Sequence, residues 1–209
     1  MNANRGPSPW LMLAALMAVV AVSAALGAVQ APSGADQARA GLHTALQATV
    51  AASGYTEDFK QTSPQGTDEY HLVYQAPDRL SGYHTVAGRR LYVSAVGTTF
   101  YEGVSGAPGG GQSSARYIGQ PSRPASTIDP VQQDFTLLVR DTGRAVNVTR
   151  VGDVYTFDVA QIGHFTVTVT GPYATSMVVQ GAGGTDVLEV GGIDSSPPAF
   201  VPSRSQLVG

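Results

Sequence analysis

The chain has 209 residues, of which 43% are apolar and only 13% are charged. It contains no cysteine, which excludes disulfides, thiolate metal sites, thiol nucleophiles and lipid attachment through an N-terminal cysteine. The single lysine, Lys60, does not stand in a phosphate-binding Gly-Lys-Ser/Thr loop or a Ser-x-x-Lys pair. With 12 basic and 15 acidic residues the net charge is -3, which argues against a nucleic-acid partner because phosphate binding usually needs a basic surplus. The composition fits one weakly charged domain, and we expect it not to be an enzyme.

Residues 10–29 form an uncharged run dominated by Leu, Ala, Val and Met, and Arg5 precedes it. A helix of roughly 20 residues crosses the hydrocarbon core of a bilayer, whereas the apolar core of a cleaved signal peptide has about 7–15 residues. The length favours a retained signal anchor, and the small residues at 25, 27 and 28 leave a cleaved signal peptide open. Because Arg5 lies before the run, the positive-inside preference predicts that everything after Ala31 leaves the cytoplasm.

We therefore predict a protein of the cell envelope, either anchored to the plasma membrane through residues 10–29 or secreted. The predicted division of the chain is a signal anchor or signal peptide over 1–31, a domain over 32–202 and a tail over 203–209.

The exported part is predicted to begin with a helix over residues 36–53, which carries apolar residues at helical spacing and ends at Gly54. Alternation with period two then predicts antiparallel strands connected by hairpins. In the first half of the domain the strands cover residues 70–74, 83–86, 91–96 and 100–101. In the second half they cover residues 145–151, 154–159, 164–170, 174–180 and 185–190.

The composition changes over residues 103–130, which contain six Gly and four Pro, so we expect a long loop there. Thr127 or Asp129 is predicted to cap a second helix that begins near Pro130 and ends at about residue 142 or 143. Its apolar stripe consists of Val131, Phe135, Leu138 and Val139. The proline-rich residues 195–209 are expected to form an extended arm, either packed along a sheet edge or disordered.

No set of residues predicts catalysis, metal binding or a cofactor. Ser105 lacks the second glycine of a hydrolase elbow and leads into a loop. The adjacent carboxylates Glu57-Asp58 and Asp68-Glu69 point to opposite faces of a strand, so we interpret them as solvated strand ends. The histidines do not have the spacing of metal ligands and are interpreted as surface or rim residues: His43, His71, His84 and His164.

Apolar side chains alternate along more strands than two helices can cover. A curved sheet that rolls around itself either fills its interior with side chains or leaves a cavity for an apolar ligand. The candidate cavity residues are the large apolar side chains of the strands and of the second helix: Leu72, Tyr74, Leu80, Leu91, Val93, Phe100, Phe135, Leu138, Phe157, Phe165, Val167 and Val169.

One stretch of the chain resembles a known family. The segment Tyr74-Gln-Ala-Pro-Asp-Arg79-Leu80, followed by Gly88, a strand at residues 91–93 and Phe-Tyr-Glu at 100–102, resembles the LolA-like superfamily. This superfamily contains periplasmic lipoprotein carriers and mycobacterial lipid-binding lipoproteins. The order of the predicted elements over residues 36–202, including Gly-Asp-Val-Tyr-Thr-Phe at 152–157, is also similar.

The resemblance implies an α+β, mainly β, fold with a curved antiparallel sheet that forms a half-open barrel. Helices would close its concave side over an apolar chamber that receives acyl chains, and the N-terminal transmembrane helix would be additional. Arg79 would then lie on the rim, and Tyr74 and Leu80 beside the chamber. Members in actinobacteria are commonly attached through a cysteine, which this chain lacks, so residues 10–29 would supply the attachment.

The expected function is therefore that of a binding protein that holds a lipid or other apolar ligand in the half-barrel cavity, and the finer expectation is lipid or lipoprotein trafficking in the envelope. The alternative is a structural or interaction protein of the envelope with the same fold and a filled core. The sequence identifies no protein partner.

Overall fold

The computed structural model of the protein describes residues 33–208 except 87, 106–109, 122–123 and 126–127. Residues 34–209 form one compact unit. The unit contains a continuous hydrophobic core, as an independently folding domain does. The predicted membrane segment at residues 10–29 lies outside the described residues. Among the helices of the described part, none is long and apolar enough to cross a membrane.

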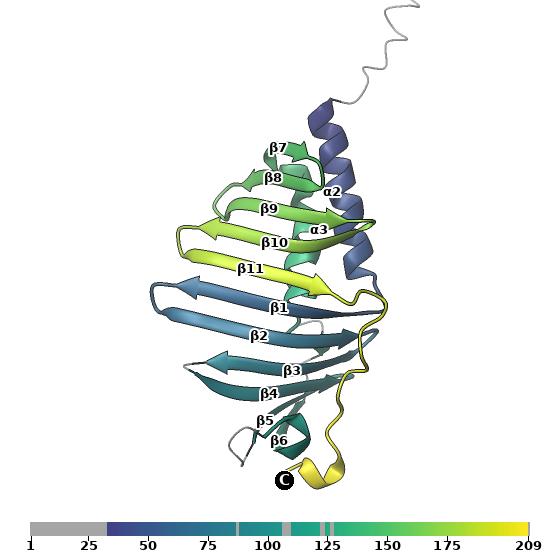
Figure 1. The fold of residues 1–209 in the computed structure, drawn as a ribbon, viewed down its shortest axis with the longest axis vertical. Coiled ribbons are helices and arrows are strands. Elements are labelled where there is room, and N and C mark those ends of the chain that lie inside the picture. Colours follow the sequence, from purple (N-terminus) through teal and green to yellow (C-terminus); the bar gives the residue numbers. More distant parts are fainter. Residues whose placement is uncertain (1–32, 87, 106–109, 122–123, 126–127, 209) are drawn as a thin grey trace, which may run out of the picture. The chain divides into compact units, whose positions relative to one another are not determined.

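The domain is built on one open, curved sheet of eleven antiparallel strands (Figure 1). The strand order is β6-β5-β4-β3-β2-β1-β11-β10-β9-β8-β7, so the first and last strands pair in the middle. The strands are β1 (Gly54–Ser63), β2 (Gly66–Gln75), β3 (Arg79–Val86), β4 (Arg89–Val96), β5 (Thr99–Ser105), β6 (Ala115–Pro121), β7 (Val146–Val151), β8 (Val154–Val159), β9 (Gly163–Thr170), β10 (Tyr173–Gly181) and β11 (Gly184–Gly191). The predicted mainly β class with an antiparallel sheet is confirmed.

Two helical segments pack against one face of the sheet, which we call the inner face. The first is α2 (Gly34–Val50), which contacts β7 and β10 and buries Leu42 and Leu46. The second, which we call the helical cover, consists of a π-helical turn (Val131–Phe135) and α3 (Thr136–Asp141). Short 3₁₀ turns occur at Gln112–Ser114, Thr142–Arg144 and Arg204–Gln206. Both predicted helices are present, although the first ends three residues before its predicted end and the second begins as a π turn.

The register of the strands explains where the core lies. In the β1–β6 half, Tyr55 faces Tyr74 on the neighbouring strand, and Tyr74 faces Leu80. In the β7–β11 half, Leu188 faces Met177, which faces Val167 on the next strand. Because side chains alternate between the two faces, these rows all point to the inner face and form the main core with the helices.

The prediction of a loop over residues 103–130 was wrong for its central part. Residues 115–121 form strand β6, which pairs with β5, and Tyr117 is fully buried. Tyr117 lies opposite Gly103, where an added Cβ atom would come within 2.7 Å of the tyrosine ring. This glycine therefore makes room for a large side chain inside the sheet. The glycine and proline content of residues 103–130 had instead suggested a loop.

The C-terminal arm packs on the other, outer face of the sheet and ends beside β6 (Figure 1). The Phe200 N–H donates to Ser81 Oγ at 2.7 Å, and the Ser94 hydroxyl donates to the Phe200 carbonyl at 2.9 Å. Further along, the Val208 N–H donates to the Tyr117 carbonyl at 2.8 Å. The alternative of an arm packed along a sheet edge is thus confirmed, and the arm protects the otherwise open edge of β6.

Candidate functional site

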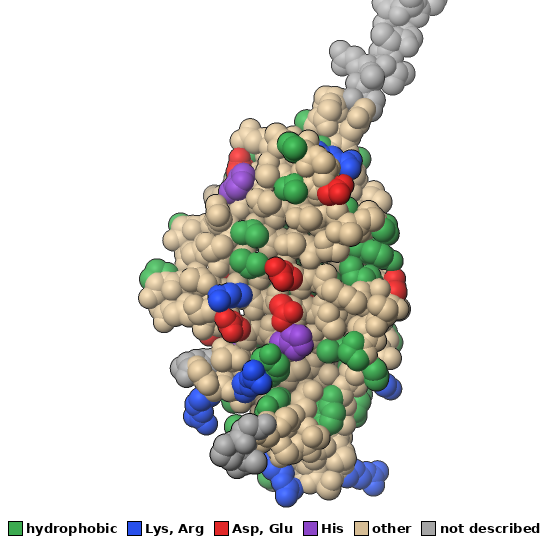
Figure 2. Space-filling view, in the orientation of Figure 1, with side chains coloured by type: hydrophobic (Ala, Val, Ile, Leu, Met, Phe, Trp, Pro, Cys, Tyr) green, Lys and Arg blue, Asp and Glu red, His purple; other side chains and the backbone are tan. Residues whose placement is uncertain are grey.

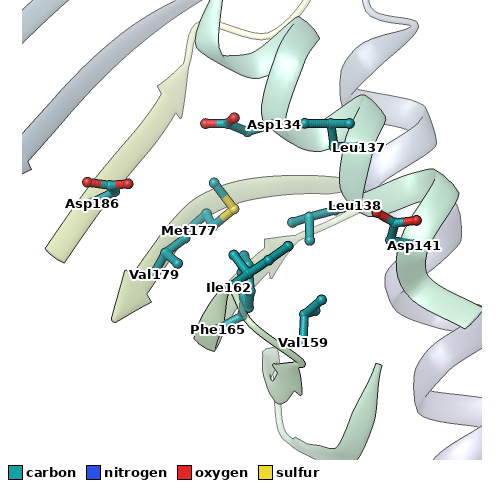
Figure 3. A pocket seen from close by; sticks show the side chains of 10 residues that line it. All are labelled: Asp134, Leu137, Leu138, Asp141, Val159, Ile162, Phe165, Met177, Val179 and Asp186. Carbon is teal, nitrogen blue, oxygen red and sulfur yellow. The ribbon is translucent and has the colours of Figure 1, made fainter. Parts of the chain in front are cut away.

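A partly open pocket lies on the inner face, between the helical cover and strands β8–β11 (Figure 3). It encloses about 130 Å³, and seven of its ten lining residues are apolar. The lining residues are Leu137, Leu138, Val159, Ile162, Phe165, Met177, Val179, Asp134, Asp141 and Asp186.

The pocket has a buried floor and a half-exposed rim. Leu138, Phe165 and Met177 are buried, because the cover and the inner-face rows of β9 and β10 meet there. The Phe165 ring is held in place by stacking on Phe157 of β8, with the ring centroids 5.0 Å apart. By contrast, Leu137 and Ile162 are 46% and 51% exposed, although both line the pocket. An apolar floor reached past exposed apolar side chains is the geometry of a site for an apolar group.

The charged groups of the pocket are all acidic. Asp141 is neutralised by Arg140 at 3.2 Å and Arg144 at 3.6 Å, and its hydrogen bond from Arg140 lowers its pKa. The pKa of Asp134 is raised to about 6, first because the carboxyl group is partly removed from water and second because of the negative charge of Asp186. Among the described residues that line the pocket, none is a lysine, arginine or histidine.

Two further acidic residues, Asp129 and Glu57, are buried and join the helical cover to the sheet. The Tyr55 hydroxyl donates to Asp129 Oδ2 at 2.9 Å, and the Gln132 N–H donates to Asp129 Oδ1 at 2.8 Å. The Val131 N–H donates to Glu57 Oε2 at 3.2 Å. These bonds join β1 to the first turn of the cover, so Asp129 caps this segment as predicted.

Glu57 corrects the interpretation of its carboxylate pair as a solvated strand end. It is 0% exposed, because it lies on the inner face of β1, whereas its neighbour Asp58 is exposed on the outer face. Burial is the main cause that raises the pKa of Glu57, and the nearby charge of Asp129 raises it further. Burial also raises the pKa of Asp129, to about 6.

The structure places the twelve predicted cavity residues on the inner face or on the helical cover. Leu138 and Phe165 line the pocket. Leu91 is half-buried at the margin of the face, and Val169 packs against the core. The other eight belong to the filled core: Leu72, Tyr74, Leu80, Val93, Phe100, Phe135, Phe157 and Val167. For these ten residues, a role in ligand binding stays a prediction.

Sequence reasoning missed most of the pocket lining. Met177 and Val179 alternate on a predicted strand, so the period-two pattern could have found them. Asp134 lies one helical turn before Leu138, at the margin of the predicted apolar stripe. An acidic residue at that place was a usable signal for a polar group beside an apolar site. The contribution of Asp186 depends on the pairing of β11 in the sheet, which no local pattern shows.

The outer face carries a second hollow of about 290 Å³ near the centre of the sheet. Four of its charged or titratable groups pair with one another, Lys60 with Glu69 at 3.0 Å and His71 with Asp58, and Glu189 also lines it. Figure 2 shows acidic, basic and histidine side chains close together near the middle of the face that it presents. Within the described residues, no three His, Asp or Glu side chains come together as a metal site. We therefore take the inner pocket as the candidate site.

Two mycobacterial proteins of solved structure are similar to this chain. The lipoprotein LppX of Mycobacterium tuberculosis matches with a TM-score of 0.52 and 12% identity, over 79% of this chain and 98% of LppX. LprF from Mycobacterium bovis matches with a TM-score of 0.48 and 14% identity, over 80% of this chain and 96% of LprF. No protein-family model matches the chain, and no curated protein matches its sequence. The chain thus has the fold of a mycobacterial lipoprotein, and its resemblance to the LolA-like superfamily is confirmed at the level of the fold.

Proposed function

We propose that the protein is a non-enzymatic binding protein of the cell envelope that holds the apolar end of a lipid-like ligand in the pocket beneath the helical cover. The observation that carries this proposal is the partly open cavity with seven apolar lining residues on the inner face of an open sheet. The fold shared with a lipoprotein and the predicted export of the domain support the envelope as the place of action. A role in lipid or lipoprotein trafficking is the finer part of the same proposal.

The size of the pocket limits what it holds. Its 130 Å³ is close to the volume of a dry protein cavity, about 150 Å³, that accepts a benzene molecule. The pocket therefore has room for about six carbon atoms. The rest of a longer chain would leave past Leu137 and Ile162, whose exposed apolar surface lies at the opening.

The expected affinity for a short chain is modest. Burying six methylene groups at about 0.8 kcal/mol each contributes roughly 5 kcal/mol, and association itself costs at least about 4 kcal/mol. The two contributions nearly cancel, so a single short chain binds only weakly. A lipid that also covers the rim would bind more tightly.

A filled core favours the alternative of a structural or interaction protein, because eight of the predicted cavity residues are packed against one another. In that case the sheet is only a scaffold, and the pocket is a packing defect. The two functions differ in whether the pocket takes up a ligand.

The test uses residues 33–209, purified without detergent from an actinobacterial host, after thermal unfolding has shown that they fold cooperatively. Organic extraction and mass spectrometry should find a stoichiometric lipid. The variant Val179→Trp, which fills the pocket, should lose it. Val178→Trp, the neighbouring position on the outer face of β10, is the matched control and should retain it. Absence of lipid from the native protein, or equal retention by both variants, would contradict the proposal.

A further inference from the structure

We infer that the pocket is selective for the charge of its ligand, and that it takes an aliphatic chain whose polar end is an ammonium group in preference to a chain that ends in a carboxylate. This inference rests on the proposed function, since it names the ligand class of the same pocket. It is carried by two acidic side chains, Asp134 and Asp186.

These two side chains reach the pocket from opposite walls. Asp134 belongs to the π-helical turn of the cover, and Asp186 belongs to β11. Figure 3 shows the Asp134 carboxylate extending from the cover toward the side of the pocket where Asp186 stands. Both residues line the same pocket, and the charge of Asp186 raises the pKa of Asp134. The apolar floor of Leu138, Phe165 and Met177 lies beside them.

The two carboxylates have no cationic partner among the described residues. The ion pairs in that part of the chain include Asp141, which two arginines hold, but neither Asp134 nor Asp186. The other acidic group that faces Asp134 is Glu57, below the cover, and it is fully buried. Every titratable group at the opening therefore contributes negative charge or is already neutralised.

An ammonium group beside these carboxylates balances the negative charge that the protein leaves without an ion pair. It donates up to three hydrogen bonds, and bonds between an ammonium and a carboxylate are stronger than those between neutral groups. It also removes the repulsion between two like charges in a partly desolvated place. A ligand carboxylate at the same position adds a third negative charge and is repelled.

An inorganic cation fits less well. Calcium takes six to eight oxygen ligands and magnesium about six. The pocket offers two carboxylates without an ion pair and a third, Asp141, which two arginines hold; its other lining residues are apolar. An ammonium head needs only the two carboxylates, while its aliphatic chain uses the apolar floor.

The experiment compares octylammonium, octanol and octanoate, which have the same chain and differ in charge. Each is titrated, below its micellar concentration or solubility limit, into residues 33–209 at pH 7.5 and low salt, and binding is followed by calorimetry. We expect octylammonium to bind about tenfold or more tightly than octanoate, with octanol between them. The preference should weaken as salt is added, because the rim is partly exposed.

The double variant Asp134→Asn/Asp186→Asn tests the assignment to these residues. Its octylammonium and octanoate affinities should agree to within about threefold, while its octanol affinity stays close to that of the native protein. Asp153→Asn, which removes an exposed charge in the β7–β8 turn, is the matched control and should retain the full preference. The single variants give the same readout if the double variant unfolds.

The outcomes separate this inference from the proposed function. If none of the three compounds binds, the proposed function fails and the inference fails with it. If octanol binds and the native protein shows no preference for octylammonium, the function stands and the inference is overturned. A preference that survives in the double variant also overturns it.

Discussion

The β1–β6 half and the β7–β11 half of the sheet have the same alternation of apolar side chains, but their inner faces are packed differently. In the β1–β6 half the inner face is filled, with Tyr55 stacked on Tyr74 at 4.8 Å, and the C-terminal arm covers the outer face. In the β7–β11 half the outer face carries exposed and half-exposed hydroxyl side chains such as Thr166 and Thr168. In this half the inner face leaves the pocket beneath the helical cover.

The difference shows that alternation determines which face of a strand is apolar, whereas the covering segment determines whether that face is filled. The inner-face side chains of the β1–β6 half lie in the main core, which also contains Ala125 and Val131. The β7–β11 half is covered by α2 and by the helical cover, which reaches the sheet through Leu138 and leaves Leu137 at the opening. We therefore expect the first half to stabilise the domain and the second half to bind.

The largest expected effect is on the free energy of unfolding when the filled half loses a side chain. Leu72→Ala should lower it by about 3–5 kcal/mol, because the residue is fully buried and the cavity cannot collapse. Leu138→Ala should lower it by only about 1–2 kcal/mol, because its side chain already borders an open pocket. Urea unfolding measures both, and equal losses would remove the distinction between the halves.

The arm over the outer face should matter for stability and not for binding. Phe200→Ala removes a ring that packs on Tyr117 and should lower the unfolding free energy by about 2–3 kcal/mol, with unchanged octanol affinity. Val201→Ala, at an exposed position of the same arm, is the control and should change stability by less than about 0.5 kcal/mol. A loss of octanol binding in Phe200→Ala would show that the halves are coupled.

The two buried acidic residues, Asp129 and Glu57, make the free energy of unfolding depend on pH. The pKa of Asp129 is about 6 in the folded protein against an ordinary 3.8, and the pKa of Glu57 is raised as well. The folded state therefore holds more protons than the unfolded chain over this range. The stabilising contribution is complete below about pH 4 and is lost as the pH rises through 6 and beyond.

Replacing Glu57 by glutamine should remove part of this dependence. Glu57→Gln keeps the acceptor for the Val131 N–H and cannot ionise, so it should be more stable than the native protein by about 1–3 kcal/mol at pH 9 and nearly equal to it at pH 4. Thermal unfolding from pH 4 to pH 9 gives the comparison. A difference that did not vary with pH would show that Glu57 does not titrate in this range.

The sequence predicts the β7–β11 half better than the β1–β6 half. Strands β8–β11 are found to within a residue or two, because Phe165, Val167 and Val169 alternate with threonines. The sequence pattern does not predict β1 as a separate strand, because this segment is rich in polar residues. In the structure it pairs, in the centre of the sheet, with β11, which is far away in the chain. Strand β6 is hidden by glycines that have a packing role, as Gly103 does beside Tyr117.

The candidate site could also be predicted only in part: its apolar floor could be predicted, and its acidic rim could not. The apolar floor follows from local periodicity, which pointed to Leu138 and Phe165. The acidic rim and the buried Glu57 depend on which segments meet in space, and a charged residue is usually read as solvated. The pocket is the space that remains between the cover and the sheet, and no local pattern encodes it.

The most direct test of the central claim uses the methyl group of Met177, which is the only methionine of the domain and lies on the pocket floor. Residues 33–209 carrying ¹³C-methyl methionine and leucine are titrated with octanol. The account predicts saturable shifts of the Met177 and Leu138 methyl resonances, while those of Leu72 in the filled half stay in place. No shift at Met177, or equal shifts at Leu72, would contradict it.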